Sequence, residues 1–262
     1  MNTASLRIVA LLALLALLAL PVTALAWDHD CRYSTDRKAS IDTTGAARIE
    51  IMARAGDLVV RPASGPVLTA GGRACASSKA YLDQTQLHVR RQGDVVQVQV
   101  QVPDEMKGIG LLYASLDLTV SVPAELPVEV TDSSGDVTLE SVRVTKVLDS
   151  SGDISARALK GDVEIEDSSG DVRVEETAGA VRVSDSSGDV VIRGARGVHI
   201  PMDSSGDIVI DRISGDVRID RDSSGDIRIA DVGGSVDVLA DGSGQVRVTG
   251  VKGAVQLPAD SH

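Results

Sequence analysis

Repeated aspartates are the residues in this chain with the clearest potential for chemistry. The phrase Asp-Ser-Ser-Gly-Asp occurs six times between Asp132 and Asp226, at intervals of 17 to 19 residues, and a degenerate copy begins at Asp241. Carboxylate, hydroxyl and backbone carbonyl oxygens are the ligands that Ca²⁺ prefers, six to eight at a time. Stacked copies would form two aspartate columns of candidate metal ligands: Asp149, Asp167, Asp185, Asp203 and Asp222 in one, and Asp153, Asp171, Asp189, Asp207 and Asp226 in the other.

The same phrase also has a purely structural explanation. The first Asp can accept hydrogen bonds from backbone amides that follow it, which forms an Asx turn, and Gly supplies a positive φ. The nonapeptide of known calcium-binding β-helices, Gly-Gly-x-Gly-x-Asp, does not occur in the sequence. We therefore expect structural turns and no cofactor. Calcium bound by the stacked aspartates is kept as the alternative.

Catalysis has no clear candidate residue. The four histidines, at positions 29, 88, 199 and 262, are scattered, and none recurs beside an Asp-Ser pair. A Ser-His-Asp triad is therefore not indicated. Polysaccharide lyases use related β-helices, but the near-identical turns show no single coil specialised for a reaction. We expect no enzyme, with an envelope polysaccharide-acting enzyme as a remote alternative.

The repeats predict the elements that position these aspartates. Each phrase leads into an alternating strand such as Val172-Arg173-Val174, and a weaker copy, as at Gly161 to Ile165, stands midway to the next phrase. A turn and a strand of nine residues, used twice per coil, indicate a solenoid. The prediction is an all-β protein, a parallel β-solenoid of about seven coils of 18 residues over 132–257. The apolar pairs from Val163 and Ile165 to Val246 and Val248 should face inward.

The region before the repeats, residues 27–131, is expected to be an irregular β region that caps the solenoid. An isolated copy of the repeat, Gly56 to Val60, and a strongly alternating segment, Val95 to Val102, predict strands there. Gly108 to Tyr113 is an apolar loop, which we expect to be tucked against the core because large exposed apolar patches are uncommon. At the other end, Pro258 opens a tail, 258–262, that should blunt the last strand edge and favour a monomer.

The N-terminus predicts export. Arg7 precedes an apolar run from Ile8 to Leu20, and Ala24-Leu25-Ala26 provides a cleavage pattern, which together are typical of a secretory signal peptide over residues 1–26. The run is shorter than the roughly 20 residues of a membrane span. The mature protein should therefore be periplasmic or extracellular and lack a transmembrane anchor. In that oxidising compartment, Cys31 and Cys75 should form a disulfide.

Composition narrows the range of partners. The net charge is −12 and only four residues are aromatic. Nucleic acid is disfavoured because phosphate binding needs clustered Lys and Arg. A lectin is disfavoured because the repeats offer no aromatic platform for a sugar.

A signal peptide, β-rich segments ending at Val122-Pro123 and the repeated Ser-Gly-Asp turns together resemble a bacterial domain-of-unknown-function family labelled putative adhesins. The resemblance covers roughly Ile49 to Leu257. It implies a parallel β-solenoid in the cell envelope or outside the cell, and it brings no catalytic residues. The expected function is adhesin-like binding or scaffolding with an unknown envelope or surface partner. A calcium-responsive repeat module is the competing prediction.

Overall fold

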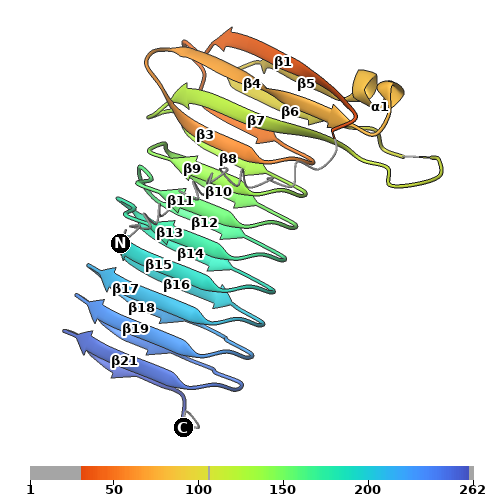
Figure 1. The fold of residues 1–262 in the computed structure, drawn as a ribbon. Coiled ribbons are helices and arrows are strands. Elements are labelled where there is room, and N and C mark those ends of the chain that lie inside the picture. Colours follow the sequence, from red (N-terminus) through yellow and green to blue (C-terminus); the bar gives the residue numbers. More distant parts are fainter. Residues whose placement is uncertain (1–30, 106, 260–262) are drawn as a thin grey trace, which may run out of the picture. The chain divides into compact units, whose positions relative to one another are not determined.

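The computed structural model describes residues 31–105 and 107–259. The predicted signal peptide, residues 1–26, lies outside the described residues, as do the last three residues of the predicted tail. Strands dominate the described chain, and the single helix in it is α1, Lys79–Gln84. Figure 1 shows the repeat strands stacked one below the next, which confirms the predicted all-β parallel solenoid.

The strands form two sheets of eleven strands each. Sheet A contains, in chain order, β1 (Tyr33–Asp42), β3 (Leu58–Ala63), β4 (Val67–Ala76), β7 (Ala114–Pro123), β9 (Val137–Glu140), β11 (Ile154–Arg157), β13 (Val172–Glu175), β15 (Val190–Ala195), β17 (Ile208–Ile213), β19 (Ile227–Val232) and β21 (Val246–Val251). Sheet B contains β2 (Arg48–Met52), β5 (Gln86–Gln92), β6 (Val95–Gln101), β8 (Val128–Thr131), β10 (Val144–Leu148), β12 (Val163–Glu166), β14 (Ala180–Ser184), β16 (Gly197–Met202), β18 (Val217–Ile219), β20 (Val236–Val238) and β22 (Val255–Gln256).

Pairing between coils follows the repeat of the sequence. In sheet B, Val163 of β12 pairs with Val181 of β14, and in sheet A, Val172 of β13 pairs with Val190 of β15, in both cases 18 residues apart and parallel. Successive nine-residue units therefore alternate between the two sheets. One coil supplies one strand to each sheet, as the half-period of the repeat predicts.

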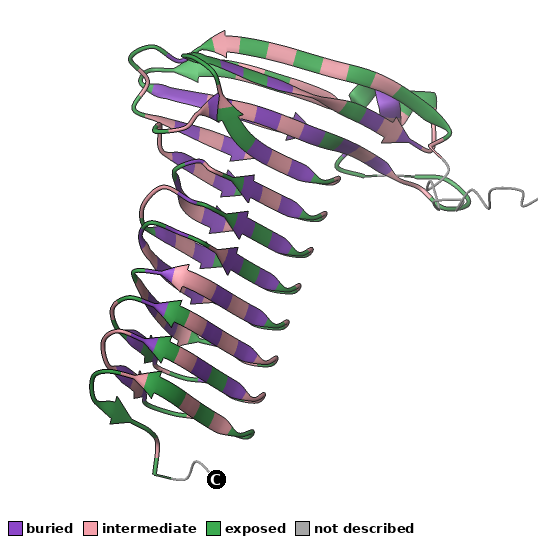
Figure 2. Cartoon of the chain, turned by 60° about the vertical axis from the view of Figure 1, so that its left-hand side comes forward, coloured by how far each residue is buried: buried purple, intermediate pink, exposed green. Residues whose placement is uncertain are grey.

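The core lies between the two sheets and is built from single layers of β-branched side chains. The predicted inward pairs are buried from Val163 to Val238, whereas Val246 and Val248 of the last long strand are only partly covered. Figure 2 shows this alternation of buried and exposed positions along each strand. Val198 and Ile200 of β16 are also buried. We did not predict this strand, because it has lost the Gly-Asp start of the other units.

The N-terminal region covers the first repeat coil with regular strands, where we expected irregular structure. β3 pairs in parallel with β9 on one side and β7 on the other, while β2 pairs with β8 and β6. The coil made by β2 and β3 thus lies between the repeats and the coil made by β6 and β7. It fits there because Gly56 to Val60 carries the same turn and strand pattern as the repeats.

Antiparallel strands complete the two sheets at this end. β4 pairs with β7 and β1 with β4 in sheet A, and β5 pairs with β6 in sheet B. The short helix α1 follows β4 and is capped at its N-terminus by Ser78, whose side chain accepts a hydrogen bond from the Tyr81 amide. A disulfide joins Cys31, just before β1, to Cys75 in β4. It links the start of the described chain to the strand against which β1 pairs.

The apolar loop between β6 and β7 differs from the prediction. Ile109 and Leu111 are almost fully exposed instead of being tucked against the core. The reason lies in the geometry of the connection, which leaves the sheets after Val102 and returns only at Ala114. The core between β6 and β7 is already filled by their own alternating side chains, among them Val98, Val100, Leu116 and Leu118.

Candidate functional site

The two aspartates of each turn phrase have opposite environments. The first aspartate is buried, from 0 to 5 % exposed, in all six copies: Asp132, Asp149, Asp167, Asp185, Asp203 and Asp222. The second aspartate is exposed in the first four copies, for example Asp171 and Asp189, and partly exposed at Asp207 and Asp226. The structure therefore places the predicted ligands in two separate columns. We call the first the buried aspartate column and the second the outer aspartate column.

Members of the buried aspartate column close the turns. Oδ1 of Asp149 accepts hydrogen bonds from the amides of Ser150 and Ser151, at 2.7 and 3.3 Å. Asp167 and Asp185 repeat the arrangement. This is the Asx turn that the sequence predicts. The second oxygen, Oδ2, of Asp149, Asp167, Asp185 and Asp222 has no donor in hydrogen-bond geometry among the described residues, and in Asp132 and Asp203 neither oxygen has one. The amides of Ser133, Ser204 and Ser205 still lie near enough to lower the pKa values of Asp132 and Asp203 in part.

A buried carboxylate without donors is costly to ionise, because the charged form loses its water. Burial raises the pKa of Asp132 and Asp203 to about 7, and that of Asp167 and Asp222 to about 6. Neighbouring carboxylates add to the effect; for Asp203 these are Asp222 and Asp185 in the adjacent coils. Burial therefore shifts the buried aspartate column toward the protonated, neutral form, most strongly at Asp132 and Asp203.

The outer aspartate column hydrogen-bonds to backbone amides of the next coil. Oδ1 of Asp153 accepts a hydrogen bond from the amide of Asp171 in the next coil, at 2.9 Å, and Asp171 does the same for Asp189. The series continues through Asp207 and Asp226 to the amide of Gln245. Each carboxylate thus satisfies a backbone donor that the parallel ladder leaves open at the turn. Arg228 bridges Asp207 and Asp226, which offsets part of the repulsion between them.

Neither column provides a preformed cation site. Across residues 31–105 and 107–259, no group of three or more His, Cys, Asp or Glu side chains is close enough to hold a metal ion. One carboxylate per coil lies along each column, roughly one strand spacing of 4.8 Å from the next. Calcium binding by these aspartates stays a prediction that this geometry does not test.

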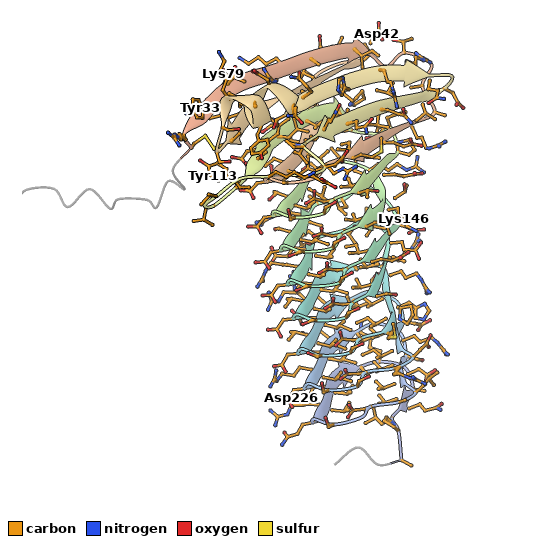
Figure 3. The ribbon with its side chains drawn as sticks, turned by 90° about the vertical axis from the view of Figure 1, so that its right-hand side faces the viewer. Tyr33, Asp42, Lys79, Tyr113, Lys146 and Asp226 are labelled. Atoms are coloured by element: carbon orange, nitrogen blue, oxygen red, sulfur yellow. A yellow bond between two sulfur atoms is a disulfide. The ribbon has the colours of Figure 1, made fainter. Side chains whose placement is uncertain are left out.

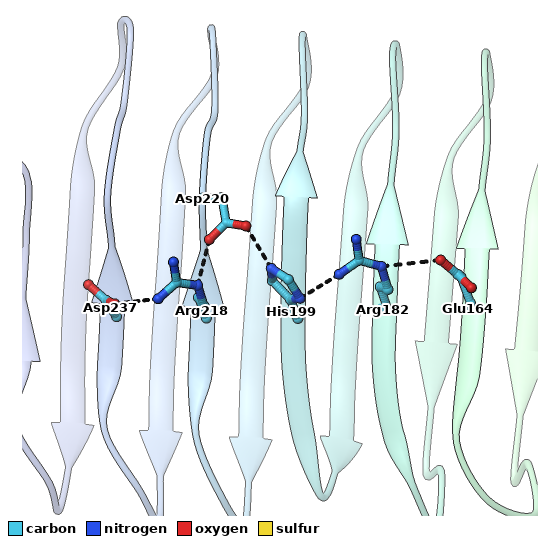
Figure 4. A network of polar contacts seen from close by, with 6 residues as sticks. All are labelled: Glu164, Arg182, His199, Arg218, Asp220 and Asp237. Atoms are coloured by element: carbon cyan, nitrogen blue, oxygen red, sulfur yellow. Dashed lines mark hydrogen bonds and ion pairs between the residues drawn. The ribbon is translucent and has the colours of Figure 1, made fainter.

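A polar network on the outer face of sheet B is the feature that the sequence analysis missed. Figure 4 shows the series Glu164, Arg182, His199, Asp220, Arg218 and Asp237, in which one strand after another contributes a side chain. Arg182 can only donate, so Nδ1 of His199 accepts from it at 2.6 Å, and Nε2 donates to Asp220 at 2.8 Å. This hydrogen bond from His199 lowers the pKa of Asp220.

An open groove of about 1100 Å³ shares Glu164, Arg182 and His199 with this network and lies over the first residues of β12, β14 and β16. Its floor is hollow because Ala178-Gly179-Ala180 replaces the larger Lys160-Gly161-Asp162 of the preceding coil. Charged side chains from the neighbouring coils form its walls. Those walls contain Glu125, Arg143, Lys160, Asp162, Glu164, Arg182, Arg196, His199 and Asp216.

Most charges in the groove are paired with each other. Lys160 pairs with Glu125, Arg196 with Asp162 and Arg182 with Glu164. Arg143 makes no ion pair within the described part of the chain. One sequence signal could have located this groove. The Gly-Asp phrase is lost at Gly179-Ala180, while Arg182 is retained and a His stands at position 199.

No helix in the described residues is long and apolar enough to cross a membrane.

Comparison with known proteins adds three low-identity structures. A "putative cell adhesion protein" from Clostridium sporogenes is 10 % identical, with a TM-score of 0.40, and the alignment covers 86 % of this chain and 99 % of that one. A "putative lipid binding protein" from Parabacteroides distasonis is 13 % identical, with a TM-score of 0.46 and coverages of 84 % and 96 %. A "putative adhesin" from Bacteroides fragilis is 10 % identical, with a TM-score of 0.35 and coverages of 79 % and 97 %.

No curated protein matches the sequence. A family model does match, over residues 78–197, which include most of the groove lining and four of the six turn phrases in full. This match confirms the resemblance predicted from the Ser-Gly-Asp turns: residues 78–197 carry the sequence pattern of the Toastrack DUF4097 family.

Proposed function

We propose that this protein is a non-enzymatic, exported binding protein of the bacterial envelope that holds an extended polar partner in the groove over β12, β14 and β16. The observation that carries the proposal is the groove itself, a hollow floor of small residues between regularly spaced charged walls. A rigid two-sheet core beneath it fixes the spacing of the wall residues, so little ordering entropy is lost on binding. Within the groove, Arg143 is the cation left to pair with an anionic group of the partner.

Filling the groove should weaken binding of the partner. Ala178 lies on the floor and is exposed, so Ala178→Trp would occupy the hollow without disturbing the core. The matched control is Ser155→Trp, an exposed outward position on sheet A. Purified peptidoglycan sacculi and the anionic polysaccharide polygalacturonate are suitable probes, with co-sedimentation as the measurement. We expect at least a tenfold loss of affinity for Ala178→Trp and no change for the control.

Three results would count against this proposal. One is a wild-type protein that binds neither probe, and another is equal binding by both Trp variants. The third is shortening of polygalacturonate during incubation, detected by size-exclusion chromatography, which would support the alternative of a polysaccharide-acting enzyme.

Export is part of the proposal. Removal of residues 1–26 would place the first residue of the mature chain at Trp27. Mass spectrometry of protein purified from the periplasm or medium should therefore give an N-terminus at Trp27. An intact Met1 in a cytoplasmic fraction would contradict the proposal.

A calcium-responsive repeat module is the second candidate. What supports it is the set of buried aspartate oxygens without a donor, which an ion could satisfy. Calcium ions and protons would neutralise the same buried carboxylates. Measuring stability in chelator and in millimolar calcium at a fixed pH shows which of the two does so.

A further inference from the structure

The loop between β6 and β7 displays an apolar tip to solvent. The exposed fractions of Ile109 and Leu111 are 105 % and 94 %, whereas the other exposed large apolar side chains in the described chain lie between 37 and 46 %. The flanking Gly108 and Gly110 add no bulk, and a Cβ at Gly110 would meet nothing within 4 Å. Figure 1 shows this connection extending past the ends of β6 and β7, on the side of α1.

Both ends of the loop are fixed to the body of the protein. Oη of Tyr81 in α1 accepts from the amide of Lys107 at 2.6 Å and donates to its carbonyl at 2.7 Å. At the other end, the Ser77 amide donates to the Tyr113 carbonyl at 3.0 Å, and the Tyr113 amide donates to Oγ of Ser77 at 3.2 Å. The exposure of Ile109 and Leu111 is therefore set by the anchored base.

The small apolar area of the tip indicates which kind of partner it can bind. Two aliphatic side chains supply only a small part of the roughly 800 Å² that each member of a stable protein complex buries. A lipid interface needs no shape complementarity, and it gains from any apolar side chain that leaves water. A protruding tip therefore suits a bilayer better than a second protein surface.

Charge at the base of the loop is mixed, because Asp104 and Glu105 lie beside Lys107. Lys107 is exposed at the base of the loop, and Lys79 is exposed at the start of α1, which Figure 3 shows beside Tyr33 and Tyr113. Glu105 forms an ion pair with Lys107 at 2.6 Å. Lys79 makes no ion pair within the described residues, so it is the basic residue near the tip that can attract an anionic headgroup.

We propose that residues 108–112 form a membrane-contact loop, in which Ile109 and Leu111 enter the interfacial region of a lipid bilayer. The contact uses a different part of the molecule from the groove, so it does not depend on the proposed function.

Vesicle binding tests this proposal. The protein from Trp27 onward contains the whole compact unit that begins at Cys31 and lacks the apolar run Ile8 to Leu20, which would itself bind lipid. The probe is phosphatidylethanolamine–phosphatidylglycerol vesicles, measured by co-sedimentation. The double variant Ile109→Ser with Leu111→Ser should bind at least tenfold more weakly. The matched control, Val67→Ser with Leu239→Ser, removes two apolar side chains that are 44 % and 42 % exposed and should bind within twofold of the wild type.

Depth of insertion provides a second measurement. In a background with Trp27→Phe, which removes the one natural Trp, Leu111→Trp should show a blue-shifted emission with vesicles and quenching by brominated lipid; Leu239→Trp should show neither. Failure of the wild type to sediment with vesicles would overturn the proposal. So would equal binding by the two double-Ser variants, or a dimer that the loop variant dissociates, since the tip would then contact a second copy.

Discussion

Lowering the pH from 8 to 5 should raise the melting temperature of this protein by roughly 10 °C. The cause is the buried aspartate column. Its folded-state pKa values reach about 7 for Asp132 and Asp203 and about 6 for Asp167 and Asp222, against 3.8 for the unperturbed group. Differential scanning calorimetry in matched buffers of equal ionic strength is the measurement.

The sign follows from proton linkage. A group whose pKa is higher in the folded than in the unfolded state binds more protons when folded, so its contribution to stability is complete below pH 3.8 and is lost as the pH rises through the folded value. The window for this column is therefore pH 4 to about 7. Between pH 8 and pH 5 a carboxyl with a folded pKa of about 7 changes its contribution over about two pH units, which corresponds to on the order of 3 kcal/mol. At about 2 to 4 °C per kcal/mol in a chain of this size, that is roughly 10 °C.

Substitutions within one turn test whether the buried aspartate column causes the pH dependence of the melting temperature. Asp203→Asn removes a charge at a buried carboxyl with no donor, so it should raise the melting temperature at pH 8 and reduce the difference between pH 8 and pH 5. The control, Asp207→Asn, lies four residues away in the outer column, where the hydrogen bond from Arg228 lowers the pKa of Asp207. It should leave the pH dependence unchanged. A melting temperature that is flat or falls on acidification to pH 5 would refute the assignment.

Calcium supplies the competing way to neutralise this column. If protons do so, the melting temperature and the circular dichroism spectrum at pH 7.5 should be the same in chelator and in millimolar calcium. If calcium does so, chelation should unfold the region from Asp149 to Asp226, because ion binding would then contribute to the folding free energy. A calcium-induced gain of β signal would favour the second candidate function.

The fold was predictable because the short sequence repeat determines how successive coils stack along the whole solenoid. A turn and a strand of nine residues can bury its apolar face only by stacking on its neighbours, so the periodicity alone gave the two sheets and their register. The position of β3 between β7 and β9, and of β2 between β6 and β8, was not predictable. It depends on which strands far apart in the chain pair with each other, and Gly56 to Val60 specifies a coil without specifying its neighbours.

The candidate sites were predictable only in part. The phrase correctly placed two aspartates per turn, but their burial depends on which side of the turn each carboxylate takes. The first folds back under the turn to reach the serine amides, and the second points along the stack to the next coil. The groove was missed because small residues form it. Residues 178–180 lack the bulky side chains that the adjacent coils carry at the equivalent positions.

Replacing Gly188 should destabilise the protein more than replacing any glycine in an open turn. Gly188 has a φ of +141°, and a Cβ at this position would lie 1.9 Å from the carbonyl oxygen of Gly170 in the adjacent coil. Gly161 also has a positive φ, +104°, but a Cβ there would meet nothing within 4 Å. The pair therefore separates backbone strain from the clash between stacked turns.

Gly188→Ala should cost roughly 3 kcal/mol or more, since strain of about 1 to 2 kcal/mol is joined by the displacement of a neighbouring backbone. Gly161→Ala should cost only about 1 kcal/mol, from strain alone. Gly188→Val adds branching at Cβ and should be worse than Gly188→Ala. Urea unfolding followed by circular dichroism gives the free energies. Equal losses for the two Ala variants would show that φ alone requires glycine, and an unaffected Gly188→Ala would show that the turns do not stack as closely as the ladder of Gly amides and Ser carbonyls requires.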